Sequence, residues 1–546
     1  MWYKAEAAVG SEFAGKYLYD NGLDPIYVSD NPILNAQHVV FEAAKAYKYG
    51  LPYHAALASV TSAPAENLGL GKRLGKVKAG FDADVVVWDS DPLSVGATPV
   101  QVWIDGTAQF ADPVELDKPF HSTMSPNEAL AEVPGDRNKR VVRADDVIFT
   151  GVSRILLIDV DIPGPDDATF NVAVSGGTIT CIGRCAEELE LASRTKDGSV
   201  IPLRNGYLTR PYVAFGSMLG LNAIESERVT DNGADFNSFS RAIDGLALDT
   251  EKLRVGHRSG VTRAISAPRF IRENSHHGTS VGFQTGAISP LDDGAIFAED
   301  AAVHYTLDLS VKKADGTPSL SSSLGQLRDK LLDAIALSSL DGSAAYENPD
   351  SEMAFLKRVV SGELPLAITV HSADVIATLL RIKGEVEETA NNQSGIPRKI
   401  RIIIIGGAEA HLLADRIAEA EVGVVLAPFQ SFGVSWDQRR ALVGAPLSNS
   451  TSVDVLTKAG VTTAIGLEED WVVRDLGLLA GIAHKNIGGR ISEEAAVDLI
   501  TGNVYKMLGL SQPDWRQHFV IHEGNPLEID SRVKAVSDGM HQLYIL

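Results

Sequence analysis

The stretch VTSAPAENLGLGKRLGKVKAGFDADVVVWDSDPL, residues Val60–Leu93, decides the fold because the chain contains it twice. A weaker copy begins as ITGNVYKMLGL at Ile500 and resumes as FVIHEGNPL at Phe519. Leu68–Leu70 of the first copy matches Leu508–Leu510 of the second. The distance between the copies is far beyond the periods of solenoids and propellers. The repeat therefore predicts a duplicated domain, with both ends of the chain forming the same part of one fold.

Composition sets the broad class of the protein. A chain of 546 residues has room for two or more domains, and 45% hydrophobic with 22% charged residues is ordinary for a globular protein. No run of about eighteen apolar residues occurs, so we expect no membrane span. The N-terminal sequence MWYKAEAAVGSEF lacks the pattern of a signal peptide. We expect a soluble protein, and its compartment stays open.

The charge and the cysteines exclude two kinds of site. A net charge of −22 argues against nucleic acid as a partner, because neutralising phosphates needs clustered Lys and Arg. Cys181 and Cys185 are the only cysteines, and their C-x3-C spacing without a second pair does not suit a structural zinc site. The spacing leaves a local disulfide open, and we favour two buried thiols.

The order of motifs in the first copy carries a family resemblance. A helix ends in T-x-x-P-A-x-x-L-G-L, Arg73–Gly75 is expected to form a short strand, Lys78–Gly80 a turn, and Asp82–Asp84 leads into the apolar run Val85–Trp88. This order resembles the C-terminal end of the metal-dependent amidohydrolase superfamily, in which a last barrel helix feeds a small β-sandwich. The chain looks most similar to fungal-type amidohydrolase-related proteins that are grouped with carbohydrate-esterase-like deacetylases. The resemblance implies hydrolysis of a non-peptide carbon–nitrogen bond in a small-molecule amide by water activated on a divalent metal, zinc.

Residues 1–110 are expected to form the C-terminal part of a first amidohydrolase unit. Asp24–Asp30 is expected to be a short apolar strand that ends in an acid. In the family, the last barrel strand ends in an aspartate that binds metal and accepts a proton from the attacking water, so the resemblance makes Asp30 the candidate catalytic and metal-binding residue. Ordinary turn chemistry is the alternative explanation of this aspartate. The strands with the other ligands would precede Met1, so we expect this unit to lack roughly its first three quarters.

A linker and a second, complete unit are expected to follow. Residues 111–140 carry several prolines and little periodicity, which is typical of a linker. Residues 141–204 contain alternating apolar strands and resemble the N-terminal half of the same β-sandwich. The repeat makes residues 511–546 its returning strands. These two segments flank residues 205–510, where the pattern changes.

Strands separated by helices fill residues 205–510, the pattern of a parallel α/β sheet or barrel. Seven or eight such units over about three hundred residues fit a (β/α)8 barrel better than an open sheet. No G-x-G-x-x-G or G-x-x-x-x-G-K-[ST] motif stands at a strand–helix turn, which disfavours a nucleotide-binding fold. The expected fold is therefore α/β: a (β/α)8 TIM-like barrel with an attached composite β-sandwich, preceded by a partial copy of the same fold.

The second unit keeps few of the metal ligands that the resemblance implies. Active sites of such barrels lie at the C-terminal ends of the strands. If Leu219–Gly220 is in register with the family's H-x-H-L-G-like run, Gly216 and Met218 replace its two histidines. Thr369 replaces the first histidine of a later H-x-H-x-A-D run, and His371 is kept as the candidate metal ligand. Gly406 replaces a third metal histidine.

Other polar groups near these strand ends offer weaker candidates. Glu409 and His411 belong to the start of a helix, and Glu468 could hold a metal weakly together with His371, although two ligands are too few for a tight site. A hydrogen-bonded structural histidine is the alternative for His371. The motif His276–Gly278 stands in a polar loop that could face the barrel mouth, and we favour solvent exposure. The arginines of the 435–440 segment could recognise a carboxylate, and a solvated loop is the alternative.

Two hypotheses from different classes remain. In the first, a longer parent molecule hydrolyses an amide in its first unit, with Asp30 as base and metal ligand. In the second, the chain is a non-catalytic pseudo-amidohydrolase, a scaffold or dimerisation unit, and homo-oligomer formation is left open. The depleted ligand set predicts that this chain alone lacks a complete site. The substrate and the metal stay open.

Overall fold

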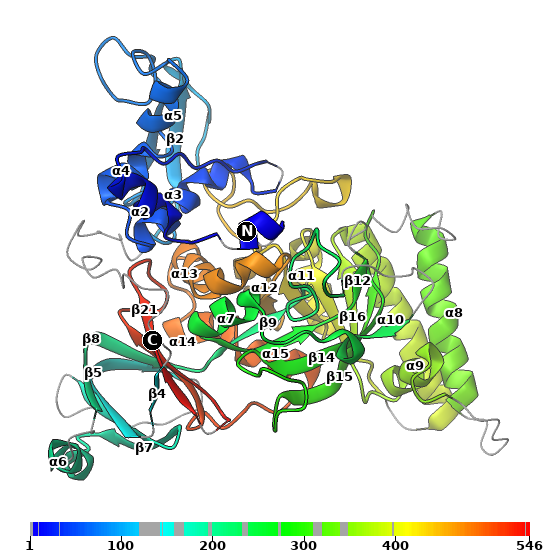
Figure 1. Cartoon of the computed structure of the whole chain (residues 1–546). Coiled ribbons are helices and arrows are strands. Elements are labelled where there is room, and N and C mark those ends of the chain that lie inside the picture. Colours follow the sequence, from blue (N-terminus) through cyan, green and yellow to red (C-terminus); the bar gives the residue numbers. More distant parts are fainter. Residues whose placement is uncertain are drawn as a thin grey trace.

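The computed structural model describes residues 4–8, 10–31, 33–118, 142–144, 146–157, 169–194, 199–231, 239–270, 275–309, 319–338, 348–395, 398–540 and 542–546. A curled central sheet covered by helices stands beside a second large sheet, and the N-terminal helices lie on the helical layer around α13 (Leu476–Asn486) (Figure 1). None of the helices in the described residues combines the length and low polarity that crossing a membrane requires.

The central sheet is mixed rather than fully parallel. Its strands follow the order β19-β18-β17-β16-β15-β14-β11-β9, and β10 pairs with β14. The strand β14 runs antiparallel to both neighbours, so a β14–β15 hairpin stands where we expected a parallel strand and a helix. The bounds are β9 (Tyr212–Phe215), β10 (Ser240–Arg241), β11 (Val261–Ser266), β14 (Gly278–Gln284), β15 (Ile296–Thr306), β16 (Leu366–Val370), β17 (Ile402–Gly406), β18 (Gly423–Leu426) and β19 (Thr463–Ile465).

The two end strands of this sheet approach each other without pairing as strands in the described residues. One backbone hydrogen bond joins them, from the N–H of Leu467 to the carbonyl of Phe215 at 2.7 Å. The observed fold is a mixed α/β fold with a curled half-barrel sheet. A complete ring of eight paired strands is not what these pairings form.

Continuous apolar strands place hydrophobic side chains on both faces of the sheet, as expected for strands covered on both sides. Ile402 and Ile404 pack in the large core under the outer helices, whereas Ile403 and Ile405 pack in a separate inner core. The helices and helical turns that follow β9 are η2 (Ala242–Gly245), α7 (Glu251–Arg258), α8 (Leu320–Ser338), α9 (Glu352–Val360), α10 (Ala373–Ser394), η4 (Ala410–Leu413), α11 (Ala414–Glu419), η5 (Trp436–Gln438), α12 (Ser452–Lys458), η6 (Asp470–Asp475), α13, α14 (Glu493–Asp498) and α15 (Gly502–Leu508).

The second large sheet draws its strands from two distant segments of the chain. Residues 142–209 and 518–545 form one eight-stranded sheet in the order β4-β22-β21-β20-β8-β5-β6-β7, which brings together the segments that the repeat predicted would meet. Phe149 and Phe519 pack in its larger core, and Ile148 and Ala173 belong to a smaller one. The strands are β4 (Val142–Ala144), β5 (Asp146–Leu156), β6 (Phe170–Ser175), β7 (Thr178–Gly183), β8 (Ser199–Thr209), β20 (His518–Glu523), β21 (Arg532–Asp538) and β22 (Leu543–Ile545).

A disulfide joins Cys181 and Cys185 beside α6 (Ala186–Arg194) of this sheet, with a Cα–Cα distance of 5.8 Å. Our preference for two buried thiols was wrong. Cys181 lies in β7 and Cys185 in the segment that follows it. Their Cα atoms are therefore within the range that a disulfide requires.

The N-terminal part contains a hairpin that matches β20–β21 residue for residue. Val85 pairs with Trp103 in the first hairpin, and Phe519 pairs with Ser537 in the second. Both hairpins change register at the same step, between Val87 and Trp88 in the first copy and at the equivalent place in the second. The strands of the first copy are β1 (Val85–Trp88), β2 (Pro99–Ile104) and β3 (Thr107–Ala108).

The helices before each hairpin also match. In the first copy α5 (Ser62–Asn67) follows Thr61, whose hydroxyl donates to the carbonyl of Leu57 at 2.7 Å. In the second copy α15 follows Thr501, whose hydroxyl donates to the carbonyl of Val497 at 3.0 Å. The other N-terminal helices are α1 (Ala5–Ala8), α2 (Ala14–Asp20), η1 (Ala36–His38), α3 (Val39–Lys48) and α4 (Tyr53–Ala58).

Two local expectations for this region were wrong. Residues 24–29 form no strand and Asp30 lies in a turn, because this backbone pairs with no neighbouring strand and only Tyr27 donates a backbone bond, to Ser59 at 3.2 Å. Residues 73–75 lie in turns rather than in a short strand, because the backbone folds back and the N–H groups of Arg73 and Leu74 both bond to Leu70.

The two copies pack on each other reciprocally. Lys48 of α3 donates to the carbonyls of Ile529 and Ser531, which follow the first strand of the second hairpin. In return, a Cβ on Gly481 of α13 would lie 2.9 Å from Val95, the residue of the first copy that matches Ile529. The chain leaving the first hairpin is held by Lys118, which is ion-paired with Asp89. The rest of the predicted linker, from 119 onward, lies outside the described residues.

Candidate functional site

His371 stands where the sequence placed it, directly after β16 at the C-terminal ends of the strands. The residue is buried, and its Nε2 lies 3.3 Å from the side-chain nitrogen of Gln438. Its Nδ1 has no hydrogen-bond partner among the described residues. A histidine in this setting presents one free nitrogen.

The position of the missing third histidine is filled by His371 itself. Gly406 ends β17 with a φ of 97°, and a Cβ there would lie 2.6 Å from Cε1 of His371. Real Cβ atoms do not approach carbon atoms so closely, since packed interiors have no room for such overlap. A side chain at position 406 is therefore incompatible with the present place of the His371 ring.

The positions of the first two replaced histidines, Gly216 and Met218, are also blocked. Gly216 follows β9 with a φ of 109°, and a Cβ there would lie 2.9 Å from the carbonyl oxygen of Leu467. Met218 is buried, and the hydrogen bond from Leu467 to Phe215 holds the backbone after β19 across the end of β9. Neither glycine nor this methionine replaces an imidazole ligand.

Glu409 is engaged in structure rather than open to a ligand. Its carboxylate is fully buried and accepts hydrogen bonds from the N–H of Ala373 at 3.0 Å and from the guanidinium of Arg440 at 2.6 Å. Burial raises the pKa of Glu409, but the bonds from Arg440 and Ala373 outweigh it and hold the pKa below the usual range. An arginine of the 435–440 segment thus does bind a carboxylate, and that carboxylate belongs to the protein. Burial lowers the pKa of the neighbouring His411.

The motif at 276–278 is not the exposed loop that we expected. The Nε2 of His277 lies 3.1 Å from Oε1 of Glu352, which also accepts from Lys330 at 2.7 Å and from Tyr305 at 2.5 Å. Burial raises the pKa of Glu352, but its bonds to His277, Lys330 and Tyr305 lower it to about 2. The ring of His277 also contacts Phe239 edge to face, so packing and hydrogen bonds both keep it from solvent.

Asp30 belongs to no group of three metal-ligating side chains among the described residues. The residue is exposed and adopts a φ of 53° in a turn. The residue that matches Asp30 in the second copy is Asp470, which follows β19 and accepts from the buried ammonium of Lys252 at 2.8 Å. The two aspartates occupy equivalent positions, and the second one is neutralised by an ion pair.

These residues do not fit a tightly bound metal. Within the described part of the chain, the one group that brings three ligand atoms of the right types together is Cys181, Cys185 and Glu188, and those cysteines form the disulfide. At the strand ends, His371 and Glu468 supply two donors, where a tight site requires three or four.

A cavity of about 200 Å³ lies between the C-terminal ends of β18 and β19 and the N-terminal copy. Sequence analysis missed it because its walls come from segments more than three hundred residues apart. The repeat was the one signal that α3 and α13 are equivalent helices. Its walls are mainly apolar, with acidic groups from both copies. The lining residues that matter below are Phe41, Glu42, Lys45, Phe429, Glu468, Glu469, Trp471, Asp475 and Leu479.

Two adjacent acids of this cavity have perturbed pKa values. Glu468 lines the cavity and is exposed to the water in it. The protein around the cavity raises the pKa of Glu468 by burial, while the charges of His371 and Arg269 lower it. Burial also raises the pKa of Glu469 to about 7. The guanidinium of Arg269 lies 3.6 Å from the Glu469 carboxylate.

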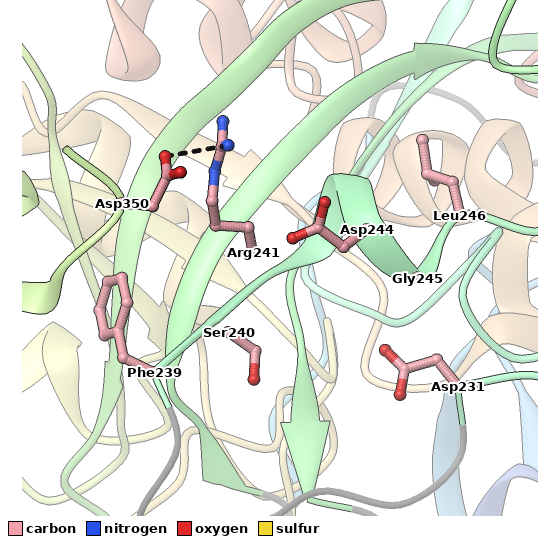
Figure 2. A pocket seen from close by; sticks show the side chains of 8 residues that line it. All are labelled: Asp231, Phe239, Ser240, Arg241, Asp244, Gly245, Leu246 and Asp350. Atoms are coloured by element: carbon pink, nitrogen blue, oxygen red, sulfur yellow. Dashed lines mark ion pairs between the residues drawn. The ribbon is translucent and has the colours of Figure 1, made fainter. Parts of the chain in front are cut away.

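A second hollow, of about 600 Å³, is open and polar (Figure 2). Figure 2 shows Arg241 pointing toward Asp350, and the ion pair measures 3.1 Å. Asp300 binds the same guanidinium at 3.0 and 3.2 Å. With its guanidinium neutralised, this hollow has no group that would capture an anion among the eight residues that line it.

Comparisons with known proteins agree on one family. The model of the Amidohydrolase family matches residues 45–108. Amidohydrolase tasK from Hapsidospora irregularis is 53% identical over 535 residues, which cover 94% of this chain and 54% of that protein. The chain thus spans about half the length of this relative.

One solved structure shares the fold of this chain. An amidohydrolase from Thermotoga maritima MSB8 superposes with a TM-score of 0.56 at 19% identity, over 72% of this chain and 98% of that one. Atrazine chlorohydrolase TrzN from Arthrobacter aurescens TC1, solved with zinc, gives a TM-score of 0.35 at 11% identity, over 72% and 94% of the two chains. The second likeness is too low to carry an argument about this chain.

Proposed function

Because this chain belongs to the amidohydrolase family, we propose that it is part of a hydrolase of non-peptide carbon–nitrogen bonds and that its own curled sheet serves as a scaffold without a metal centre. The first half of the proposal rests on the family. The second half rests on one observation: the ring of His371 occupies the space that a side chain at Gly406 would need. The closed, sandwich-bearing (β/α)8 form of the fold is likewise part of the proposal, supported by the family and by the curled sheet.

The divalent metal that the family implies, zinc, does not fit the residues at these strand ends. We therefore assign no step of the reaction to a metal in this sheet. The unpartnered nitrogen of His371 is the one imidazole donor that remains at the expected ligand positions, and Glu468 is an acid whose charge interacts with His371. The arrangement favours a supporting role, such as stabilising a catalytic unit or pairing with another subunit.

Asp30 remains our proposed catalytic and metal-binding carboxylate for the first copy of the fold. The support is its equivalence with Asp470, which follows the last strand of the central sheet, the place where the family carries its aspartate. Asp470 is tied to Lys252, whereas Asp30 is exposed. The substrate, by family, is a small-molecule amide.

Elemental analysis of the intact chain tests the scaffold half. After dialysis against zinc, we expect well under one zinc per chain, both in the wild type and in His371→Ala. His411→Ala is the matched control, because it removes an imidazole from the same end of the sheet. One tightly held zinc per chain that is lost in His371→Ala and kept in His411→Ala would overturn the proposal.

Amide hydrolysis by the complete natural protein tests the catalytic half. Asp30→Asn keeps the shape but removes the basicity, so the rate should fall by at least about a hundredfold, the lower range for acid–base catalysis. Asp24→Asn is the control for the same charge change a few residues upstream. Amidase activity of the present chain that survives Asp30→Asn would show that the central sheet holds the working site.

A further inference from the structure

The cavity between the two copies has a chemistry that the proposed hydrolase does not use. It lies outside the closed ligand positions, since neither His371, Gly216 nor Gly406 lines it. Its walls join α3 of the first copy to α13 and the β19 end of the second, so it exists only because the two copies pack together (Figure 1).

One set of charges in the cavity is already balanced. The ammonium of Lys45 lies 2.6 Å from Glu42 and 3.4 Å from Asp475, and all three side chains are less than one fifth exposed. Burial lowers the pKa of Lys45, but the two carboxylates outweigh it and raise the pKa overall. Lys45 is therefore a cation with two acidic partners, and Arg474 also acts electrostatically on this group.

The opposite wall adds acids without a matching cation in the cavity. Glu468 and Glu469 both line it, and the nearest guanidinium, that of Arg269, approaches Glu469 at 3.6 Å and donates to the backbone carbonyl of Glu468 at 3.2 Å. One arginine thus faces two carboxyl groups and is partly engaged with the backbone. Both carboxylates would attract a cation that enters the cavity.

The remaining walls suit an apolar body next to that charge. Phe41, Phe429 and Trp471 place aromatic side chains on the lining, and Leu479 of α13 adds an aliphatic surface. Aromatic faces attract cations, and apolar walls stabilise a buried hydrocarbon group. Pockets for small molecules combine such walls with a few polar groups that fix orientation.

We propose that this cavity binds a small organic cation, a protonated amine that carries an aromatic or branched aliphatic group. The ammonium lies against Glu468 and Glu469, and the apolar group lies between the helices α3 and α13. The site goes beyond the proposed hydrolase, because it needs neither a metal nor amide cleavage.

Isothermal titration calorimetry of the intact chain with three probes of similar size tests the proposal. At pH 8, we expect saturable one-to-one binding of 2-phenylethylammonium, binding of the neutral 2-phenylethanol weaker by at least about tenfold, and the weakest binding for phenylacetate. Phenylacetate or the alcohol binding as tightly as the amine would overturn the proposal. So would the absence of saturable binding of the amine in the millimolar range.

Variants locate the binding. Glu468→Gln should weaken the amine by at least about tenfold, while Glu419→Gln, an exposed acid on α11, should leave it unchanged. Leu479→Trp should fill the cavity and abolish binding, and the milder Leu479→Met keeps a readout if the larger residue prevents folding. Amine binding that is unaffected by both Glu468→Gln and Leu479→Met would place the amine elsewhere and sink the assignment.

Discussion

The hydroxyl of Tyr53 donates a hydrogen bond to Oδ2 of Asp91 at 2.7 Å, and the equivalent residues of the second copy form the equivalent contact. There, the side-chain amide of Asn525 donates to Oε1 of Glu493 at 2.6 Å. The tyrosine–aspartate pair has been exchanged for a glutamate–asparagine pair, with the donor and the acceptor reversed. In both copies the contact ties the second helix of the repeat to the loop after the first hairpin strand.

This exchange predicts how the stabilities of three variants of the Tyr53–Asp91 contact compare. Tyr53→Phe removes the donor to Oδ2 of the half-buried Asp91 carboxylate, while the N–H of Leu93 still donates to Oδ1 at 2.9 Å. The loss should lower the free energy of unfolding by about 1–3 kcal/mol. Tyr53→Glu alone should cost more, because it places two carboxylates together. Tyr53→Glu combined with Asp91→Asn recreates the pair of the second copy and should recover most of the loss. Urea denaturation of the intact chain measures all three, and a double variant no better than Tyr53→Glu would contradict the equivalence.

The overlap between a Cβ at position 406 and the His371 ring predicts that the cost in stability of Gly406→Ala depends on His371. Gly406→Ala adds a Cβ 2.6 Å from the His371 ring at a φ of 97°, so it should destabilise by both overpacking and backbone strain. Gly460→Ala is the control for strain alone, since its φ is 85° and nothing lies within 4 Å of its Cβ. The excess cost at 406 should be about 1–3 kcal/mol and should shrink in a His371→Ala background. Thermal unfolding that shows equal costs at 406 and 460 would mean that the ring moves aside freely.

The raised pKa of Glu469 predicts a pH dependence of stability. Its folded pKa of about 7 lies above its ordinary value of 4.5, chiefly through burial, with Glu225, Glu468 and Asp470 adding to the rise and Arg269 opposing it. The folded state therefore keeps a proton that the unfolded chain releases in this window. The contribution of Glu469 to stability is present below about pH 4.5 and is lost as the pH rises to about 7.

Glu469→Gln removes this dependence. Relative to the wild type, the variant should gain stability between pH 4.5 and pH 8, by up to about 3 kcal/mol. Glu419→Gln makes the same charge change at an exposed site and should show no such trend. Denaturant unfolding at a series of pH values measures the difference, and parallel curves for Glu469→Gln and the wild type would refute the assignment.

The outer edge of β1 predicts where the chain associates. In the second copy the corresponding edge of β20 pairs with β8, whereas in the first copy the edge of β1 has no partner strand among the described residues. Val87 on this strand is 44% exposed. Unpaired apolar edges favour intermolecular pairing, and a lysine on them opposes it. Val87→Lys should slow aggregation followed by light scattering, while Val77→Lys, at an exposed loop position, should not. Equal effects of the two lysines would assign the change to net charge alone.

Sequence reasoning succeeded where a pattern depends on residues close together in the chain. The repeat predicted that the two ends form the same helix and hairpin, and the matching registers of β1–β2 and β20–β21 agree with it. The resemblance to the amidohydrolase family came from the same stretch, and the family model matches residues 45–108 around it. His371 was placed correctly after a strand because apolar periodicity marks the strand end.

It failed where the outcome depends on distant packing. Asp24–Asp30 has the composition of a strand, but a strand requires a neighbour, and none adjoins it in the described residues. The antiparallel β14 looks like any buried strand in sequence, since direction leaves no periodic trace. The displacement of a ligand position by the His371 ring depends on side chains that meet only in the folded chain. We predicted an exposed loop around His277, but Glu352 of α9 binds this histidine.

The contact between Lys45 and Asp475 is not repeated on the other side of the packed copies. The positions that match them hold Lys485 and Asn35, so one half of the reciprocal arrangement has an ion pair where the other has an amide. An interface between two identical subunits must be complementary to itself, and each of its contacts occurs twice. Two copies within one chain are released from that requirement.

The release extends to the cavity. Glu468 lines it, whereas Val28, the residue that matches Glu468 in the first copy, does not. A guest with one charged end therefore meets unlike surroundings in its two orientations and is expected to enter in a single direction. Because the two copies are joined in one chain, their contact need not be self-complementary, and the two ends of the cavity differ.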